Sequence, residues 1–316
     1  MVAALEIFTA NDVLEKGLLL SGVDRKRLKR WNHPHKIRKF RNQYGAHPAV
    51  IAQIWEDLQT TDISMAKLDH SMCSFSDFMI AINFLKIYPT EDQQAMNYGK
   101  SKNNIRKWRW FFVYKLHYLR PQVVFWPKEW VDDANETEDA GNGVTKKSLR
   151  KLLISVDGVH FHTREYQHPV YSKNTKLYSH KFRTAGLSYE IGIDLNESRV
   201  VHVNGPFPAG HTDKVIFKKG LYDKIPKGCC AIGDKGYIDQ SVAEKLSTPN
   251  AHDNEETRKF KGRARARHES FNKMLKRWAI MTHRFVHEND KHVACFDAVL
   301  VLCQYQMNMG EPLFDL

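Results

Sequence analysis

The chain has 316 residues, with 48 Lys and Arg against 36 Asp and Glu, and therefore a formal net charge of +12. Its length suits about two domains of ordinary size. Hydrophobic residues make up 42% of the chain, which excludes a disordered polyelectrolyte, and no apolar run approaches the ~20 residues of a membrane span. Five cysteines without a spacing pattern, and no apolar leader, predict a soluble, reduced, intracellular protein whose charge favours a polyanionic partner.

A basic run stands near the start of the chain. Residues 24–41 contain nine Lys or Arg and one acid. Such a run is typical of a nuclear-import signal, of a phosphate-binding arm, or of both, and the alternative is a solvated helix face.

Residues 1–130 show the apolar spacing of helices. Apolar side chains recur every three or four residues over 48–58 and 75–85. A capping box then begins at Thr90, Gly99 permits a left-handed turn, and a basic helix follows from Lys102 to about residue 119. A short helix, a tight turn and a basic helix predict a helix-turn-helix near 77–119.

Three cations lie on one face of that basic helix and are candidates for DNA contact: Lys102, Arg106 and Arg109. A plain amphipathic helix without DNA contact explains them equally well.

An acidic segment divides the chain. Residues 131–147 are rich in Asp, Glu, Asn and Gly, a composition that cannot bury apolar surface and predicts a linker. Beyond it, residues 148–316 should form a second domain.

This second domain alternates strand and helix patterns. We predict strands over 152–156, 189–193, 199–203 and 229–232, with a weakly marked one at 246–249, and helices over 211–222, 242–246, 263–281 and 293–307. The order suits a mixed α/β sheet in which a meander precedes the crossovers.

Three acids are positioned for chemistry. Asp157 follows the first strand, Asp234 follows the strand over 229–232, and Glu269 is the only acid within residues 257–284, which hold ten Lys or Arg. If the two strands are parallel neighbours, both aspartates leave the sheet at the same edge. Converging carboxylates hold Mg²⁺ or Mn²⁺, and two such ions promote in-line substitution at phosphorus. The alternative for each acid is a turn or helix-cap role.

Four segments resemble, in order, the blocks of DDE transposases of the PIF/Harbinger-like nuclease family: ISVDGVHFH, PAGHTDKVIF, AIGDKGY and ARARHESFNKMLKRW. The resemblance covers roughly residues 150–305. It implies a ribonuclease H-like fold in which Asp157, Asp234 and Glu269 are the catalytic acids and ligate two Mg²⁺ (or Mn²⁺) ions. It also implies cleavage at element ends and transfer of the freed 3′-hydroxyl to target DNA.

The same resemblance implies double-stranded DNA as partner, a Myb-like accessory protein, a homo-oligomer and a nuclear location. The cations around the third acid would hold the phosphate backbone: Arg265, Lys273, Lys276 and Arg277. Three rival interpretations stay open, namely a domesticated binding module without catalysis, a nuclease that only hydrolyses, and a basic scaffold protein.

Other polar residues carry weaker signals. Asp213 either caps a helix, which we favour, or lies near enough to the acids to orient a ligand or water. Histidines and cysteines in this half lack zinc-site spacing, and the cysteines are expected in the core: His160, His162, His168, Cys229 and Cys230. Asp194 is expected to form a hairpin turn.

Overall fold

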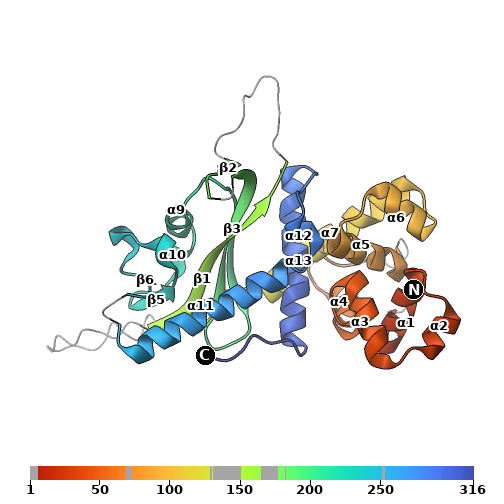
Figure 1. Ribbon diagram of the computed structural model, residues 1–316, viewed down its shortest axis with the longest axis horizontal. Coiled ribbons are helices and arrows are strands. Elements are labelled where there is room, and N and C mark those ends of the chain that lie inside the picture. Colours follow the sequence, from red (N-terminus) through yellow and green to blue (C-terminus); the bar gives the residue numbers. More distant parts are fainter. Residues whose placement is uncertain are drawn as a thin grey trace, which may run out of the picture. The chain divides into compact units, whose positions relative to one another are not determined.

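The computed structural model describes residues 6–68, 73–128, 130, 151–164, 177–181, 183–250 and 253–316. The chain forms two compact units (Figure 1). Unit 1 comprises residues 1–123 and 274–312, and unit 2 comprises residues 124–273 and 313–316. The predicted linker 131–147 and His168 lie outside the described residues. None of the described helices is both long and apolar enough to cross a membrane.

Unit 1 is helical. Its elements are α1 (Ala10–Leu20), α2 (Arg25–Arg30), α3 (His33–Tyr44), α4 (Pro48–Thr60), α5 (Phe75–Ile87), α6 (Glu91–Tyr98), α7 (Lys102–Val123), α12 (Ala279–Thr282) and α13 (Asn289–Asn308). The predicted local signals are present. Thr90 and Gln93 form a reciprocal capping box, and Gly99 ends α6 with a φ of 59°. Ser101 Oγ accepts a hydrogen bond from the Asn104 N–H at 3.3 Å and so caps α7.

The last helix and the rest of residues 274–312 belong to unit 1, whereas the sequence pattern placed them in the domain 148–316. Every side chain of α13 from Ala294 to Met307 is buried, so this helix needs partners on all sides. It packs against α7, where the buried Asp297 carboxylate contacts His117 at 2.7 Å and Arg120 at 2.9 Å. A helix of this kind forms a core rather than the surface layer of a sheet.

Unit 2 is a mixed α/β structure. Its strands are β1 (Lys151–His162), β2 (Tyr178–Ser179), β3 (Thr184–Asp194), β4 (Val200–Pro208), β5 (Cys229–Ile232) and β6 (Leu246–Ser247), and its α-helices are α9 (Asp213–Lys218), α10 (Leu221–Lys224) and α11 (Glu255–Leu275). Two 3₁₀ turns, Lys235–Tyr237 and Gln240–Val242, follow β5.

The sheet has the order β2-β3-β1-β5-β6, with β4 on β3. β1, β3 and β4 are antiparallel, whereas β5 and β6 run parallel to β1. This is the predicted meander followed by crossovers, and it is compatible with a ribonuclease H-like fold. The Asp194 carboxylate accepts from the Asn196 N–H at 2.8 Å in the β3–β4 turn, as expected.

Two helices predicted for the second domain differ from those in the structure. No α-helix spans 242–246; a 3₁₀ turn ends at Val242 and the weakly marked strand is β6, which pairs with β5. The helix predicted over 263–281 begins at Glu255 and ends at Leu275.

Helices cover both faces of the sheet (Figure 1). Ala264 and Phe260 of α11 pack against Ile232 of β5. Phe217 of α9 belongs to a separate cluster with the preceding strand residue, Ala231. Because successive strand side chains point to opposite faces, α11 and α9 lie on opposite sides of β5.

Candidate active site

Asp157 and Asp234 lie at the same edge of the sheet because of the β1–β5 register. The two strands are parallel neighbours, and their last paired residues are Ser155 and Ile232. Asp157 lies two residues after Ser155, and Asp234 lies two residues after Ile232. Asp234 therefore follows β5, as expected, whereas Asp157 lies within β1, which continues to His162 and pairs there with β3. The prediction that the first strand ends before Asp157 is wrong, but both aspartates lie just beyond the end of the β1–β5 pairing, at the same edge of β5.

The Asp157 carboxylate is half-buried and held from two sides. Its Oδ1 accepts from the Gly158 N–H at 2.9 Å, and its Oδ2 accepts from the Asn272 side-chain amide of α11 at 2.9 Å. Burial raises the pKa of Asp157 to about 6, and the charges of Asp234 and Asp213 add to this rise. Three like charges therefore act on one another at this edge.

Asp234 belongs to the turn after β5. Its Oδ1 accepts from the Gly236 N–H at 2.7 Å and caps the 3₁₀ turn Lys235–Tyr237. This turn keeps the carboxylate at the end of the strand.

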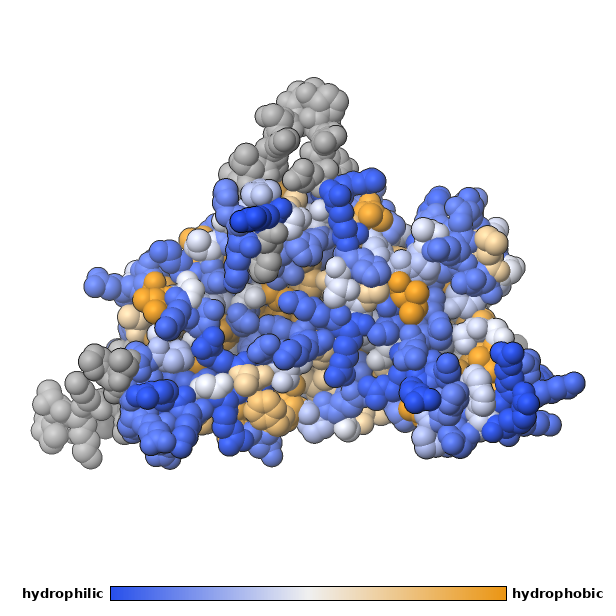
Figure 2. Space-filling model, viewed as in Figure 1, coloured by the Kyte–Doolittle hydropathy of each residue, from blue (hydrophilic) through white to orange (hydrophobic). Residues whose placement is uncertain are grey.

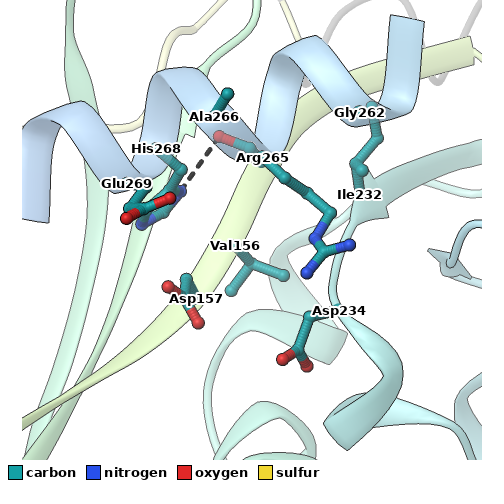
Figure 3. A pocket seen from close by; sticks show the side chains of 10 residues that line it. Val156, Asp157, Ile232, Asp234, Gly262, Arg265, Ala266, His268 and Glu269 are labelled. Atoms are coloured by element: carbon teal, nitrogen blue, oxygen red, sulfur yellow. Dashed lines mark hydrogen bonds between the residues drawn. The ribbon is translucent and has the colours of Figure 1, made fainter. Parts of the chain in front are cut away.

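Glu269 faces the two aspartates across a cavity of about 360 Å³ (Figure 3). The cavity is lined by Asp157 of β1, by Asp234 after β5, and by Arg265 and Glu269 from α11. The Glu269 side chain is 66% exposed, and its Oε1 lies 3.1 Å from Lys273 Nζ, one helical turn away. The structure thus brings all three predicted acids to one cavity, with Glu269 paired to a lysine.

The donor chemistry at this cavity fits a hard divalent cation, because carboxylate oxygens are the ligands that Mg²⁺ and Mn²⁺ prefer. Within the described ranges, no three His, Cys, Asp or Glu side chains lie close enough together to hold one ion. The carboxylates repel one another, which explains why they lie apart. A bound cation would offset this repulsion.

Glu190 is a buried acid beside the site that sequence reasoning missed. It pairs with Gly158 in the β1–β3 register and is 1% exposed. Burial raises the pKa of Glu190 well above its usual range, and the charge of Asp213 adds to this rise. His202 Nε2 on β4 lies 3.5 Å from Glu190 Oε1. The signal in the sequence was a lone acid inside an apolar strand.

The two residues that directly precede Glu269, Arg267 and His268, fix α11 against the sheet. Arg267 is 2% exposed and donates to the carbonyls of Asp194 at 2.5 Å and Glu197 at 2.6 Å. The buried His268 ring lies 3.0 Å from Ser155 Oγ through Nδ1, and burial lowers the pKa of His268 to about 3. The basic and imidazole side chains before Glu269 thus position the helix.

The predicted phosphate contacts near Glu269 are all exposed, and their surroundings differ. Arg265 extends from α11 toward Asp234 (Figure 3). Lys273 pairs with Glu269. Lys276 and Arg277 follow in unit 1, where Arg277 Nη1 lies 3.8 Å from Glu311 Oε2.

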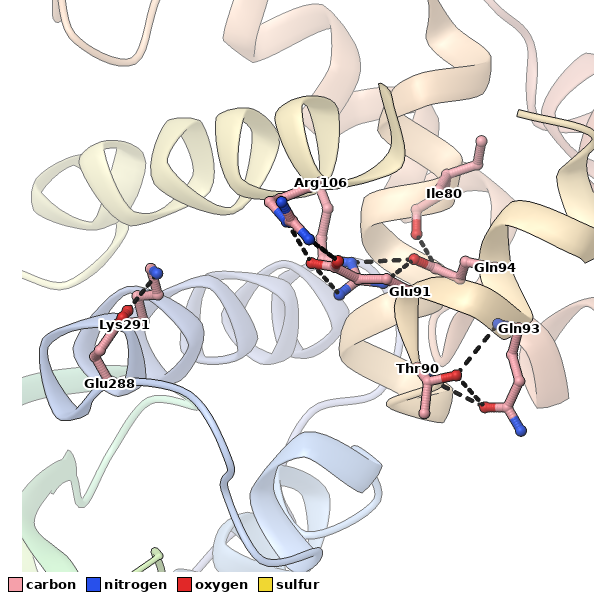
Figure 4. A network of polar contacts seen from close by, with 9 residues as sticks. Ile80, Thr90, Glu91, Gln93, Gln94, Arg106, Glu288 and Lys291 are labelled. Atoms are coloured by element: carbon pink, nitrogen blue, oxygen red, sulfur yellow. Dashed lines mark hydrogen bonds and ion pairs between the residues drawn. The ribbon is translucent and has the colours of Figure 1, made fainter. Parts of the chain in front are cut away.

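The face of α7 that was predicted to read DNA is engaged within unit 1 (Figure 4). Arg106 forms a bidentate pair with Glu91 of α6, at 2.9 and 2.6 Å, and Lys102 pairs with Asp92. Arg109 is 1% exposed and donates to Gln94 Oε1 at 2.7 Å.

The prediction that Arg109 contacts DNA is therefore wrong, because its guanidinium lies in the core, 4.1 Å from the centre of the Phe84 ring. α6, the turn at Gly99 and α7 exist as predicted, but the basic face of α7 is paired with α6.

The basic run 24–41 forms α2 and most of α3, not an extended arm. Asp24 caps α2 and pairs with Arg27 at 3.3 Å, while Leu28 and Phe40 are buried. Most cations of the run are exposed, and the surface over α2 is strongly hydrophilic (Figure 2).

The histidines and cysteines of unit 2 give no zinc site among the described residues. Cys229 and Cys230 are buried on β5, as expected of core residues. His160 and His162 stack edge to face on β1, with ring centres 5.1 Å apart.

The chain was compared with known proteins. Residues 156–304 match the model of a family described as DDE superfamily endonuclease. Searches of curated proteins and of solved structures found no match. The matched segment contains Asp157, Asp234 and Glu269, and the match supports a DDE transposase-type nuclease family for this part of the chain.

Proposed function

We propose that the protein is a divalent-metal-dependent DNA endonuclease of the DDE type. As in PIF/Harbinger-like transposases, it would cut at transposon ends and join the freed 3′-hydroxyl to target DNA. One observation carries the proposal. Within a segment that matches a DDE endonuclease family, Asp157 and Asp234 each lie two residues beyond the last pair of the parallel strands β1 and β5, and Glu269 lines the same cavity from α11.

Asp157, Asp234 and Glu269 would hold two Mg²⁺ or Mn²⁺ ions. Glu269 must leave Lys273 for this, and the cost is small, since an exposed pair one turn apart contributes only ~0.3–0.5 kcal/mol. Divalent ions at such a site supply Lewis-acid activation for in-line substitution at phosphorus. Asn272 keeps the Asp157 carboxylate in place, and Arg265 would bind the phosphate beside the cavity.

DNA binding would extend beyond the cavity. Lys273, Lys276 and Arg277 follow along and beyond α11, and the exposed cations of α2 and α3 offer a second basic surface. Neutralised phosphates release counterions, so this binding should weaken steeply with salt. By the same resemblance we propose a nuclear location, with the basic run as import signal, a Myb-like accessory protein and a homo-oligomer.

A second candidate is a transposase-derived binding module without catalysis. The pairing of Glu269 with Lys273, which occupies the third acid, favours it. The two candidates predict opposite results with the same DNA substrate.

The test is incubation of the full chain with a supercoiled plasmid and Mg²⁺ or Mn²⁺. We expect metal-dependent nicking that Asp157→Asn, Asp234→Asn and Glu269→Gln each abolish. Asp223→Asn on α10, an exposed acid outside the cavity, is the control that keeps activity. DNA binding without nicking under either metal would favour the binding module.

Strand transfer is tested separately, with a labelled oligonucleotide that ends in a free 3′-hydroxyl. Joining of the label to the plasmid supports the transposase. Nicking without joining, even with candidate terminal repeats, would leave a nuclease that only hydrolyses.

A further inference from the structure

Asp213 does not cap a helix. The N-cap of α9 is Thr212, whose side chain makes no capping hydrogen bond, and Asp213 is the first helical residue. Its half-buried carboxylate is turned toward the strand ends instead. A methyl group built on Gly158 would lie 2.5 Å from Asp213 Oδ1. The capping role favoured from the sequence is therefore wrong, and the Asp213 carboxylate lies beside the residue that follows Asp157.

The other oxygen of Asp213 faces the Asp234 turn. A methyl group built on Gly236 would lie 3.0 Å from Asp213 Oδ2 and 3.0 Å from Asp234 Oδ1, so one methyl group would touch both carboxylates. Gly158 directly follows Asp157, and Gly236 lies two residues after Asp234. The Asp213 carboxylate thus lies between the two segments that carry the aspartates, and glycine at both positions makes room for it.

A buried hydroxyl is an independent sign of a ligand at this place. Tyr237 is 0% exposed, and its Oη has no hydrogen-bond partner among the described residues. This Oη lies 4.0 Å from the same methyl position at Gly158 that Asp213 Oδ1 approaches. Buried polar atoms nearly always have a hydrogen-bond partner. The Tyr237 hydroxyl would gain one if a ligand or its bound water occupied the space among these carboxylates.

We propose that Asp213 is a further ligand of the divalent cation held by Asp157 and Asp234. This inference rests on the proposed metal-dependent function. Asp213 supplies a third carboxylate from the α9 side of the sheet, opposite to α11, which carries Glu269. A cation among these carboxylates offsets their mutual repulsion and draws them closer than they lie in this structure.

The experiment measures Mn²⁺ binding to the full chain by isothermal titration calorimetry, without DNA. We expect Asp213→Asn to weaken Mn²⁺ binding at least tenfold, the scale for loss of a group that supports a metal site. Gly158→Ala keeps every acid but displaces the Asp213 carboxylate, and it should weaken binding in the same direction. The control, Asp223→Asn, should bind as the unmodified chain does.

Thermal unfolding gives a second readout. Without metal, Asp213→Asn should raise the melting temperature, because one of three facing like charges is removed, and the rise caused by Mn²⁺ should shrink. If Asp213 only supports the fold, Asp213→Asn should instead lower the melting temperature and leave the rise caused by Mn²⁺ unchanged. That result would overturn the inference.

Asp157→Asn separates this inference from the proposed function. If Asp157→Asn weakens Mn²⁺ binding tenfold and Asp213→Asn does not, Asp213 is no ligand and the proposed function stands. If neither substitution changes Mn²⁺ binding, the metal site itself, and with it the proposed function, fails.

Discussion

Asn272 of α11 donates a hydrogen bond from its side-chain amide to Asp157 Oδ2 of β1 at 2.9 Å, across 115 residues of sequence. Asn272 is 8% exposed and lies three residues after Glu269, so the helix that carries the third acid also orients the first. Asp157 is thereby fixed through both of its oxygens, since its Oδ1 accepts from the Gly158 N–H.

Asn272→Ala should lower the metal-dependent nicking rate about tenfold, because Asp157 loses the contact that orients it. The cost in stability should be only about 1 kcal/mol, the usual contribution of one hydrogen bond. Plasmid nicking and urea unfolding measure the two effects. Ser270→Ala on the same helix is the matched control, since Ser270 Oγ donates only to the Ala266 carbonyl of α11. Equal rates for Asn272→Ala and the unmodified chain would contradict a positioning role.

Arg109→Ala should destabilise unit 1 by about 2–4 kcal/mol. The substitution leaves a cavity beside Phe84 and removes the guanidinium that donates to Oε1 of the fully buried Gln94 side chain. Arg106→Ala removes an exposed ion pair with Glu91 and should cost less than about 1 kcal/mol. Thermal unfolding of both variants checks the contrast, and equal losses would show that Arg109 does not act as a core residue.

The double substitution Lys26→Ala and Lys29→Ala should weaken DNA binding and reduce its salt dependence. Both lysines are exposed on α2, and neither pairs with an acid in the part of the chain that the structure describes. The slope of log affinity against log salt should fall by roughly 0.9 for each lost phosphate contact. Lys102→Ala with Arg106→Ala is the comparison, because acids of α6 already pair with these cations. A larger loss in that second variant would place the DNA surface on α7 instead.

Acid should destabilise unit 1 through His292. Burial lowers the pKa of His292 to about 3 in the folded chain, against an ordinary value of 6.5. Below pH 6.5 the unfolded chain binds a proton that the folded chain does not, so the free energy of unfolding falls as the pH falls toward 3. Between pH 7 and 5 this loss is about 2 kcal/mol for one such group. Urea unfolding of His292→Gln should show a loss smaller by that amount, and identical pH profiles would refute the assignment.

The sequence by itself determined the features that depend only on residues close together in the chain. Thr90 and Gln93 cap α6 reciprocally, because a capping box involves only residues three apart. The strand pattern before Asp234 placed this acid correctly after β5, whereas β1 extends past Asp157 to His162. The parallel pairing of β1 with β5 was a condition of the prediction, and the structure meets it.

Contacts between residues far apart in the chain were decided only by the tertiary structure. Arg109 has the same helical spacing as exposed cations, and its burial depends on Gln94 and Phe84 of other helices. α13 follows α11 in sequence, yet it packs on α7 because its buried surface extends all round the helix.

The candidate site divides in the same way. Asp157 and Asp234 were predictable from the sequence, whereas Asn272, Glu190 and Asp213 join them only through contacts between elements. The spacing of residues along a helix or strand determines on which face each side chain lies. Which residues that face contacts depends on how the elements pack in the tertiary structure.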